Sequence, residues 1–262
     1  MASGKRFLTI LLLLCCYLVG SSLAFAQELT VAAAADLQFA LRDLASTFEK
    51  QTGTSVKISF GSSGNFANQI ANGAPFDMFF SADLGYPRHL EEAGLTEPGT
   101  LYHYADGKIV LWAREPRFDV TRGLFLLVDP GIRKIAVANP QHAPYGRVAV
   151  AALQHEHLYD KVQNKLVFGE NISQTAQFVD TGNADVGIVA LSLLLAPTMQ
   201  GKGKYFLIPD SDYPPIEQGC VVLKSAKNKA VAQQFLAFVK QPQTVALLKK
   251  YGFGLPGQPR DH

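Results

Sequence analysis

The chain is poor in the residues that mark a disulfide-stabilised protein. Of its 262 residues only three are cysteines, and two of them, Cys15 and Cys16, lie in an apolar segment near the N-terminus. Cys220 is the only cysteine after that segment, which excludes an intramolecular disulfide in the rest of the chain. The apolar residues 221–223 that follow it indicate a buried strand, so we expect a structural role for its thiol.

An excess of charge of one sign is also absent. Two of the 24 Lys and Arg residues, Lys5 and Arg6, precede the apolar segment, which leaves 22 basic residues against 22 acidic ones. No basic run offers a surface for nucleic acid, and there is no acidic tail. We therefore expect a nearly neutral protein that does not bind nucleic acid.

Residues 1–26 have the three parts of a secretory signal peptide. A basic pair, Lys5 and Arg6, is followed by an apolar stretch and by the cleavage motif Ala24-Phe25-Ala26, and we place cleavage after Ala26. The apolar stretch is too short for a comfortable membrane span. The residues before its two cysteines do not form a good lipobox, so we expect no lipid anchor. No second hydrophobic segment approaches membrane length, which predicts a soluble, exported protein.

Strand-like and helix-like segments alternate along the rest of the chain. Strands are predicted at 29–34, 56–60, 77–81, 109–112, 135–138, 165–168, 185–190 and 218–223. Helices are predicted at 37–51, 65–71, 87–93, 145–154, 173–181, 226–240 and 242–251. Alternation of this kind predicts parallel sheets with crossover helices. Two series of similar size, the second starting at Ile109, predict two α/β lobes.

The segment Gly61-Ser62-Ser63-Gly64 joins a predicted strand to a predicted helix. A Gly/Ser turn that opens a helix leaves backbone N–H groups unpaired, and the helix dipole adds partial positive charge. The two seryl hydroxyls add further donors. Serine and glycine are common in turns that bind nothing, but this combination is typical of a site for a small anion that needs neither Lys nor Arg.

Ligands of open α/β sheets bind outside the carboxyl ends of the strands. Five predicted loops lie there, and they contain hydroxyls, amides and small residues but no Lys or Arg. These loops are Ala35–Asp36, Gly61–Asn65, Ser81–Asp83, Asn139–Gly146 and Gly169–Ser173. Their composition favours binding over catalysis.

Six segments of the chain, each weak alone, are specific in their order and spacing. They are Thr30–Leu37, Ser59–Gly64, Asn72–Asp83, Ala138–Gly146, Gly187–Val189 and Tyr251–Phe253. Through them nearly the whole chain after the signal peptide resembles the periplasmic molybdate-binding proteins of ABC importers. The resemblance implies a two-lobed periplasmic-binding-protein fold of type II. Each lobe would be a mostly parallel α/β sheet flanked by helices, and two crossing strands would form the hinge.

The same resemblance implies a division of the chain and a way of holding the ligand. Residues 1–26 would be the signal peptide, 27–107 the first part of lobe I, 108–212 lobe II, and 213–262 the segment that returns to lobe I. Molybdate or tungstate would lie between the lobes, held through its oxygens by neutral donors. No cofactor and no direct bond between protein and metal are implied.

Five residues fall at the implied ligand contacts. Ser63 would give its hydroxyl and its backbone N–H, with Ser62 beside it, and Ile172 would give its backbone N–H. Tyr145, at a helix start, would give a hydroxyl or an N–H. The remaining contact falls on Asp36, where relatives carry Ser or Asn.

Asp36 is the larger of two departures from the family pattern. A carboxylate about 4 Å from a dianion costs on the order of 2 kcal/mol even with water-like screening. Because Asp36 directly precedes a predicted helix, it can act as an N-cap that accepts the N–H of Gln38 or Phe39. Alternatively it accepts the proton of a ligand such as hydrogen phosphate, hydrogen arsenate or a small organic acid. The other departure is Ala190, where many relatives carry a Tyr that Tyr145 can replace from the other side.

Three functions follow from these observations. The leading one is an extracytoplasmic solute-binding protein, most simply a monomer, that captures molybdate or tungstate and delivers it to a membrane ABC permease. The second is the same kind of protein for a protonated oxyanion or a small organic acid, with Asp36 as acceptor. The third is a secreted hydrolase with Ser63 as nucleophile, which needs a base beside the hydroxyl.

The sequence speaks against an enzyme and against a metal site. Only His142 falls on one of the predicted cleft loops, and there is no G-x-S-x-G elbow. The motif His155-Glu156-His157 resembles a metal-binding pair, but histidines two positions apart do not share a helix face. We expect that motif to lie on a solvated surface.

Overall fold

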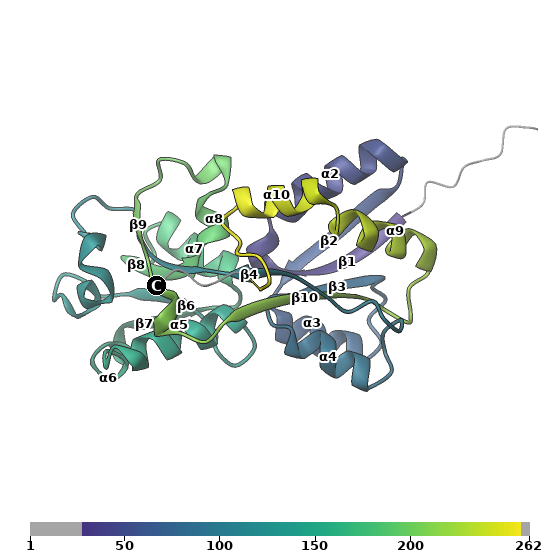
Figure 1. Ribbon diagram of the computed structural model, residues 1–262. Helices are drawn as coiled ribbons and strands as arrows, with labels where there is room; N and C mark the ends of the chain where they lie inside the picture. Colours follow the sequence, from purple (N-terminus) through teal and green to yellow (C-terminus); the bar gives the residue numbers. More distant parts are fainter. Residues whose placement is uncertain (1–27, 258–262) are drawn as a thin grey trace, which may run out of the picture.

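A computed structural model of the chain describes residues 28–257, so the predicted signal peptide and its cleavage site lie outside the described residues. The described chain forms two lobes that lie side by side, each built on a five-stranded sheet (Figure 1). Within residues 28–257, no helix has both the length and the apolar character needed to cross a bilayer.

The sheet of the first lobe has the strand order β2-β1-β3-β10-β4. Its strands are β1 (Glu28–Ala34), β2 (Ser55–Gly61), β3 (Met78–Ser81), β4 (Tyr102–Gly107) and β10 (Ile216–Val222). β1 pairs in parallel with β2 and β3, whereas β10 runs antiparallel to both β3 and β4. Four of the five strands therefore share one direction.

The sheet of the second lobe repeats this pattern with the order β7-β6-β8-β5-β9. Its strands are β5 (Ile109–Ala113), β6 (Ile135–Ala138), β7 (Leu166–Gly169), β8 (Val186–Ala190) and β9 (Lys204–Leu207). β6 pairs in parallel with β7 and β8, and β5 runs antiparallel to β8 and β9. The prediction of two lobes with mostly parallel sheets is confirmed.

Helices cover both faces of each sheet (Figure 1). The first lobe carries α2 (Ala40–Thr52), α3 (Ser63–Ala71), α4 (Gly85–Glu92), α9 (Lys229–Val239) and α10 (Pro242–Lys250). The second carries α5 (Pro144–His155), α6 (Tyr159–Val162), α7 (Ile172–Asp180) and α8 (Leu191–Leu194). Short 3₁₀ segments are η1 (Ala35–Leu37), η2 (Val120–Val128), η3 (Gln163–Lys165), η4 (Pro197–Met199) and η5 (Asp210–Asp212).

Helix α2 shows how the sequence pattern produces the fold. Its buried residues include Leu41, Leu44 and Phe48, which recur at helical spacing and so form one apolar stripe. Gly53 ends the helix with φ of 72°, a left-handed conformation that glycine adopts without steric cost. The stripe packs into the core of the first lobe, where the Phe48 ring meets that of Phe235 edge-on at 4.9 Å.

Most predicted elements lie within a few residues of the observed ones, but two strands were missed. β4 contains His and Asp, and β9 follows a glycine-rich turn, so neither has the apolar alternation of a half-buried strand. Both are the last strands of their sheets and pair on one side only. Edge strands bury less side-chain surface, which explains the weak signal. The helix expected from residue 37 begins at Ala40, because the 3₁₀ segment η1 precedes it.

Two segments connect the lobes. The chain leaves the first sheet through β4 and enters the second through β5, and it returns from β9 to β10 by way of η5. Lys108, between β4 and β5, pairs with Asp210 of η5, with 3.7 Å between Nζ and Oδ2. Alanines at the carboxyl ends of the first-lobe strands β1 and β3 contribute to the hydrophobic core of the second lobe. The small side chains at these strand ends allow the two lobes to meet closely.

Candidate functional site

The five loops predicted to carry the site come together in one small pocket between the lobes. The pocket is lined by residues of all five: Ala35, Asp36, Gly61, Ser62, Ser63, Ala82, Ala143, Pro144, Tyr145, Asn171 and Ile172, with Ala34 at the end of β1. Its volume is about 10 Å³, roughly the space that one water molecule needs. The lobes are therefore closed in this conformation.

Ser63 is the first residue of helix α3 and is completely buried. Its Oγ accepts a hydrogen bond from the backbone N–H of Ala82 at 3.0 Å. Since that bond uses an oxygen lone pair, the hydroxyl proton stays available for a second partner. The backbone N–H of Ser63 occupies the first helical position, where no partner exists within the helix. Two donors of one residue thus line the pocket.

Ser62, the N-cap residue of the same helix, is also buried but its hydroxyl has a partner from the other lobe. Its Oγ lies 3.0 Å from Nδ1 of His142. On the far side of the ring, Nε2 of His142 lies 3.5 Å from a carboxylate oxygen of Glu170. Ser62 therefore holds the lobes together in this conformation, whereas Ser63 faces the pocket without a partner from the second lobe.

The start of helix α7 supplies the opposite wall. Asn171 is its N-cap, and its side-chain oxygen accepts the backbone N–H groups of Ser173 and Gln174, each at 3.0 Å. The N–H of Ile172, at the first helical position, has no partner within the helix. Ile172 is buried and lines the pocket, so the helix presents this N–H together with the positive end of its dipole.

Tyr145 lies in the first turn of helix α5, which begins at Pro144, and its ring is buried. Its hydroxyl donates to Oδ2 of Asp36 at 3.0 Å and accepts from Nε2 of Gln218, also at 3.0 Å. The phenol proton is therefore used within the protein, whereas the backbone N–H of Tyr145 lies among the unpaired N–H groups of a helix start. Burial and the neighbouring Asp36 raise the pKa of Tyr145 well above its usual value, so the phenol stays neutral.

Asp36 is 1% exposed and sits inside the 3₁₀ segment η1. The prediction that it caps a helix is wrong, because η1 places Asp36 inside a helical turn and its side chain caps no N–H group of Gln38 or Phe39. Instead Oδ2 accepts from Nε2 of Gln218 at 2.7 Å and from the hydroxyl of Tyr145. The other oxygen, Oδ1, makes no hydrogen bond among the described residues.

Burial raises the pKa of Asp36 from 3.8 to about 6. The hydrogen bonds from Gln218 and Tyr145, and the nearby backbone N–H groups of Asp36 and Leu37, oppose this effect but do not cancel it. Loss of hydration is therefore the dominant influence on this carboxyl. The carboxyl is therefore half ionised near pH 6 in the folded protein.

The sequence analysis missed the side chains that hold Asp36 in place. Gln218 of β10 is completely buried, and its Oε1 accepts the hydroxyl proton of Tyr104 at 2.7 Å. The signal in the sequence is weak: an amide between Glu217 and Gly219 at the start of an apolar run. Gly107 was missed as well. A Cβ at that position would lie 2.4 Å from the hydroxyl of Tyr145 and 2.8 Å from Nε2 of Gln218.

Glycine at position 64 allows the lobes to close. Its backbone N–H donates to the carbonyl of His142 at 2.9 Å, across the interface between the lobes. A Cβ on Gly64 would lie 2.8 Å from that carbonyl oxygen and 2.8 Å from the hydroxyl of Tyr86. The glycine of the Gly/Ser turn thus provides close approach of two backbones, as well as a turn.

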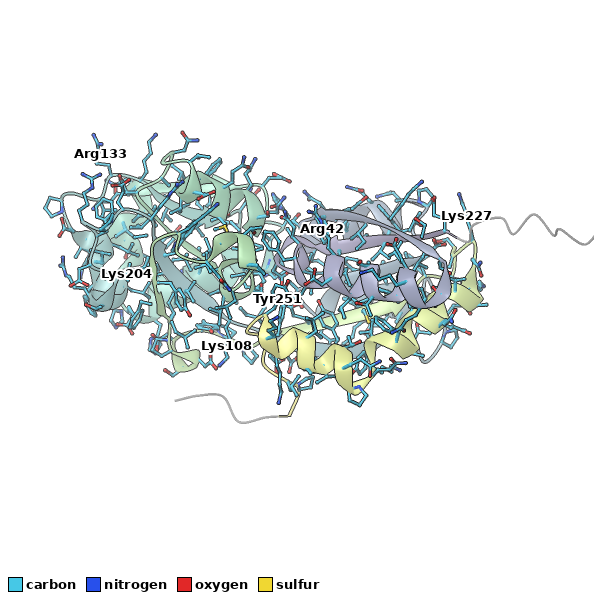
Figure 2. The ribbon with its side chains drawn as sticks, turned by 90° about the horizontal axis from the view of Figure 1, so that it is seen from above. Arg42, Lys108, Arg133, Lys204, Lys227 and Tyr251 are labelled. Carbon is cyan, nitrogen blue, oxygen red and sulfur yellow. The ribbon has the colours of Figure 1, made fainter. Side chains whose placement is uncertain are left out.

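Side chains at the rim also join the lobes. Asn65 donates to Glu170 at 2.6 Å. Arg147 of α5 pairs with Asp83 and donates to the hydroxyl of Tyr86 at 3.1 Å. None of the residues that line the pocket is a Lys or Arg. Figure 2 shows Arg133 and Lys204 on the second lobe, away from the junction where Lys108 lies.

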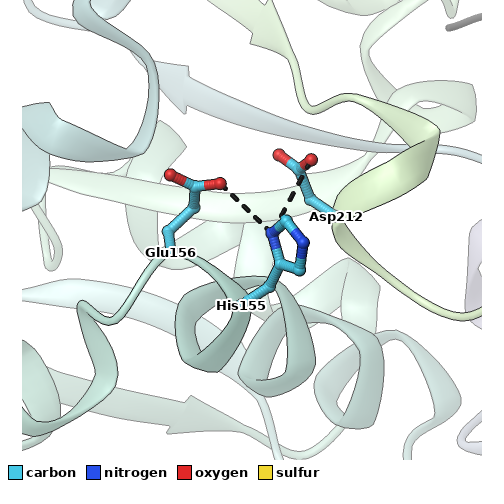
Figure 3. Close-up of side chains that lie close together, drawn as sticks. All are labelled: His155, Glu156 and Asp212. Carbon is cyan, nitrogen blue, oxygen red and sulfur yellow. Dashed lines mark hydrogen bonds and ion pairs between the residues drawn. The ribbon is translucent and has the colours of Figure 1, made fainter.

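A cluster outside the pocket joins the end of α5 to the segment that returns to the first lobe. His155 Nδ1 lies 3.2 Å from Oε1 of Glu156 and 3.9 Å from Oδ1 of Asp212 (Figure 3). His155 is exposed, as predicted. Its ring has two carboxylate partners, Glu156 and Asp212, so the cluster has a structural explanation that needs no metal.

The geometry also bears on the hydrolase hypothesis. Ser63 Oγ has the N–H of Ala82 as its partner, and the histidine near the turn, His142, contacts Ser62 instead. A nucleophile needs its base within hydrogen-bonding reach. Within residues 28–257, no histidine is hydrogen-bonded to Ser63, and the arrangement of the pocket is that of a closed binding site.

Three comparisons place this geometry among known proteins. A family model described as bacterial extracellular solute-binding protein matches residues 29–254. The molybdate-binding protein of Azotobacter vinelandii is 40% identical over 232 residues, which cover 88% of this chain and 92% of the relative. The molybdate-binding protein of Rhodobacter capsulatus is 37% identical over 230 residues, which cover 88% of this chain and 89% of that relative. A solved structure, the periplasmic molybdate-binding protein of Azotobacter vinelandii, superposes with a TM-score of 0.84 and covers 87% of this chain and all of that one.

Proposed function

The chain belongs to the family of bacterial extracellular solute-binding proteins, and we propose that its solute is molybdate or tungstate. The relatives of 40% and 37% identity are molybdate-binding proteins, and they match almost from end to end. Molybdate is a tetrahedral dianion, so a site for it needs several hydrogen-bond donors that converge from different directions.

The observation that carries the proposal is the convergence of unpaired donors in a pocket without cations. Ser63 offers its hydroxyl and its N–H from the first lobe, and Ile172 offers its N–H from the second. Tyr145 adds the N–H of a third helix start. Helix N-termini of this kind stabilise anions through aligned dipoles as well as hydrogen bonds. We assign Asp36 to the same site as a direct contact of the ligand, and Ser62 beside Ser63 as a further lining residue.

The lobes must part for the ligand to enter. A cavity of about 10 Å³ accommodates a water molecule but not a tetrahedral ion with four oxygens. The proposed complex is therefore slightly more open than the conformation described, with residues 27–107 and 213–262 moving against residues 108–212. Hinge motion of this kind uses the two connecting segments and leaves each sheet intact. A ring of donors on rigid helix starts favours the larger molybdate and tungstate over sulfate.

The role in transport follows from the family. We propose that the protein works in the periplasm after export, closes on the oxyanion, and presents the closed lobes to a membrane ABC permease. A monomer suits this delivery, and the binding of molybdate requires no cofactor. The relatives are binding proteins and not enzymes, in agreement with the expectation that the chain has no catalytic activity.

A second candidate ligand is a protonated oxyanion such as hydrogen phosphate or hydrogen arsenate. One observation favours it: Oδ1 of Asp36 is buried at the pocket and has no donor within residues 28–257. A ligand that carries its own proton would donate to this oxygen. The two candidates therefore differ in whether the ligand itself carries a proton to donate to Asp36.

Isothermal titration calorimetry of residues 27–262 with molybdate, tungstate, sulfate and phosphate tests the proposal. We expect molybdate and tungstate to bind with one site per chain, and sulfate and phosphate to bind at least a hundredfold more weakly. Binding of phosphate without binding of molybdate would establish the second candidate instead. Absence of binding by all four ions would reject both.

A further inference from the structure

We propose that Asp36 enters the complex as a neutral carboxyl group, with a proton on Oδ1 that is shared with a ligand oxygen. Capture of a dianion by this protein then takes up one proton from solvent. The inference rests on the proposed function, because it concerns the same pocket. It makes the affinity for the ligand depend on pH. A site made only of serine, tyrosine and backbone donors has no such dependence.

The two oxygens of Asp36 are in different situations. Oδ2 is satisfied by Gln218 at 2.7 Å and by Tyr145 at 3.0 Å. Oδ1 has no donor among the described residues, and the residue is 1% exposed and lines the pocket. Because both partners of Oδ2 are donors, a proton on the carboxyl belongs on Oδ1. The network therefore fixes which oxygen faces the ligand.

An ionised Oδ1 would oppose the proposed ligand. Two unit charges 4 Å apart interact by about 1 kcal/mol in water and by about 4 kcal/mol at the screening typical of a protein surface. A dianion doubles this repulsion. No Lys or Arg lines the pocket to offset it. A buried acceptor without a donor also costs free energy of its own.

Protonation of Asp36 removes both the charge repulsion and the cost of the unpaired acceptor. Before binding there are one carboxylate, one proton in solvent and one dianion. In the complex there is one neutral carboxyl group hydrogen-bonded to the dianion. No bond within the oxyanion breaks. The O–H of the carboxyl becomes one more donor of the ring.

The other titratable groups around Asp36 do not take over this role. Tyr145 of α5 and Tyr104 of β4 both have a pKa well above the usual value because of burial, so they remain neutral. Burial also raises the pKa of the Cys220 thiol in β10. His142 reaches the site through Ser62 and pairs with Glu170. A variant of His142 therefore controls for proton uptake elsewhere at the site.

The pKa of about 6 for Asp36 sets the pH range of the effect. Below about pH 6 the free protein already carries the proton, so affinity is independent of pH. Above it the proton must be taken up with the ligand, and the affinity for molybdate falls by up to tenfold for each pH unit. Asp36→Asn has a permanent NH₂ donor at this contact, so its affinity should not change with pH.

Calorimetry at pH 7.5 in buffers with different ionisation enthalpies counts the protons directly. With molybdate, we expect uptake of about one proton by the parent protein and none by Asp36→Asn. His142→Gln should still take up about one proton, whatever its affinity, because His142 is not the acceptor. At pH 5.5 uptake by the parent should fall below half a proton.

Two results would overturn the inference while leaving the proposed function intact. One is tight molybdate binding by the parent without proton uptake at pH 7.5. The other is proton uptake that persists in Asp36→Asn and disappears in His142→Gln. Failure of molybdate to bind to either the parent or Asp36→Asn between pH 5.5 and 8.5 would instead reject the proposed function.

Discussion

The start of helix α3 and the start of segment η1 face the same pocket with opposite chemistry. At α3, the hydroxyl and N–H of Ser63 are both donors, and their charge state does not depend on pH. At η1, the buried Asp36 presents a carboxyl oxygen with no donor among the described residues. On the proposed function, the first helix start provides affinity that is constant with pH, and the second makes affinity depend on protonation.

The comparison also shows why burial has different consequences at the two sites. Ser63 and Asp36 are almost equally buried. Burial strengthens the dipoles around a neutral hydroxyl, because water does not compete for them. The same burial penalises the charge of a carboxylate and raises its pKa. Four predictions test this contrast.

The largest effect should be on stability, through Asp36→Asn. The pKa of Asp36 is raised from 3.8 to about 6 on folding, so folding disfavours its ionised form. The stability that the neutral carboxyl provides is present below about pH 4 and is lost as the pH rises through about 6. Asn cannot ionise. We therefore expect Asp36→Asn to be more stable than the parent at pH 7.5, by up to about 3 kcal/mol.

Urea unfolding of both proteins at pH 7.5 and pH 4.5, without ligand, measures this difference. The gap between the two proteins should shrink strongly at pH 4.5. Asp160→Asn, on the exposed surface of α6, is the matched control and should show no such gap. A parent protein that is more stable than Asp36→Asn at pH 7.5 would mean that the carboxylate is stabilised by its partners.

Ser63→Ala should weaken molybdate binding by ten- to a hundredfold. It removes a donor to a charged ligand, which is worth about 1.5–3 kcal/mol, and leaves the N–H of Ala82 without its acceptor. Ser62→Ala is the control from the same turn, because its hydroxyl contacts His142. Calorimetry should show a smaller loss for Ser62→Ala. Equal losses for both variants would contradict the assignment of Ser63 as the direct donor.

Gly64→Ala should weaken binding by about tenfold without removing any polar side chain. The added Cβ would lie 2.8 Å from the carbonyl oxygen of His142, so the lobes could not close fully. Overpacking of this kind costs about 1–3 kcal/mol. Gln69→Ala, on the exposed face of the same helix, is the control. If stopped-flow measurements gave Gly64→Ala the same rate of molybdate dissociation as the parent protein, closure of the lobes would not limit affinity.

The smallest effect is expected at the rim. Arg147 pairs with Asp83 across the lobes, but more than a third of each side chain is exposed. Exposed ion pairs contribute about 0–1 kcal/mol. Arg147→Ala should therefore weaken molybdate binding by less than fivefold, and the loss should be smaller at high salt. A loss of affinity as large as that of Ser63→Ala would mean that residues at the rim, and not only those in the pocket, determine ligand binding.

The sequence was informative where local chemistry determines structure. The Gly/Ser turn and the five loops at strand ends indicated the pocket, because strand direction and loop position follow from the alternation of strands and helices. The partners of Asp36 could not be predicted in this way. Gln218 and Tyr104 reach it from distant strands, and only the folded chain shows that Gly107 leaves room for the phenol of Tyr145.

The expected helix cap at Asp36 failed for a related reason. A polar residue before an apolar helical run usually caps that helix. Here a 3₁₀ turn intervenes, and the carboxyl points toward Tyr145 and Gln218. A buried network formed by distant residues outweighs a local preference that is worth only about 1 kcal/mol.

A crystal structure of residues 27–262 with molybdate, recorded at the molybdenum absorption edge, would locate the bound ion. We predict a single anomalous peak between the lobes. Its oxygens should lie within hydrogen-bonding distance of the hydroxyl of Ser63, the N–H of Ile172 and Oδ1 of Asp36. A peak elsewhere on the surface, or a protein atom bonded directly to molybdenum, would contradict it.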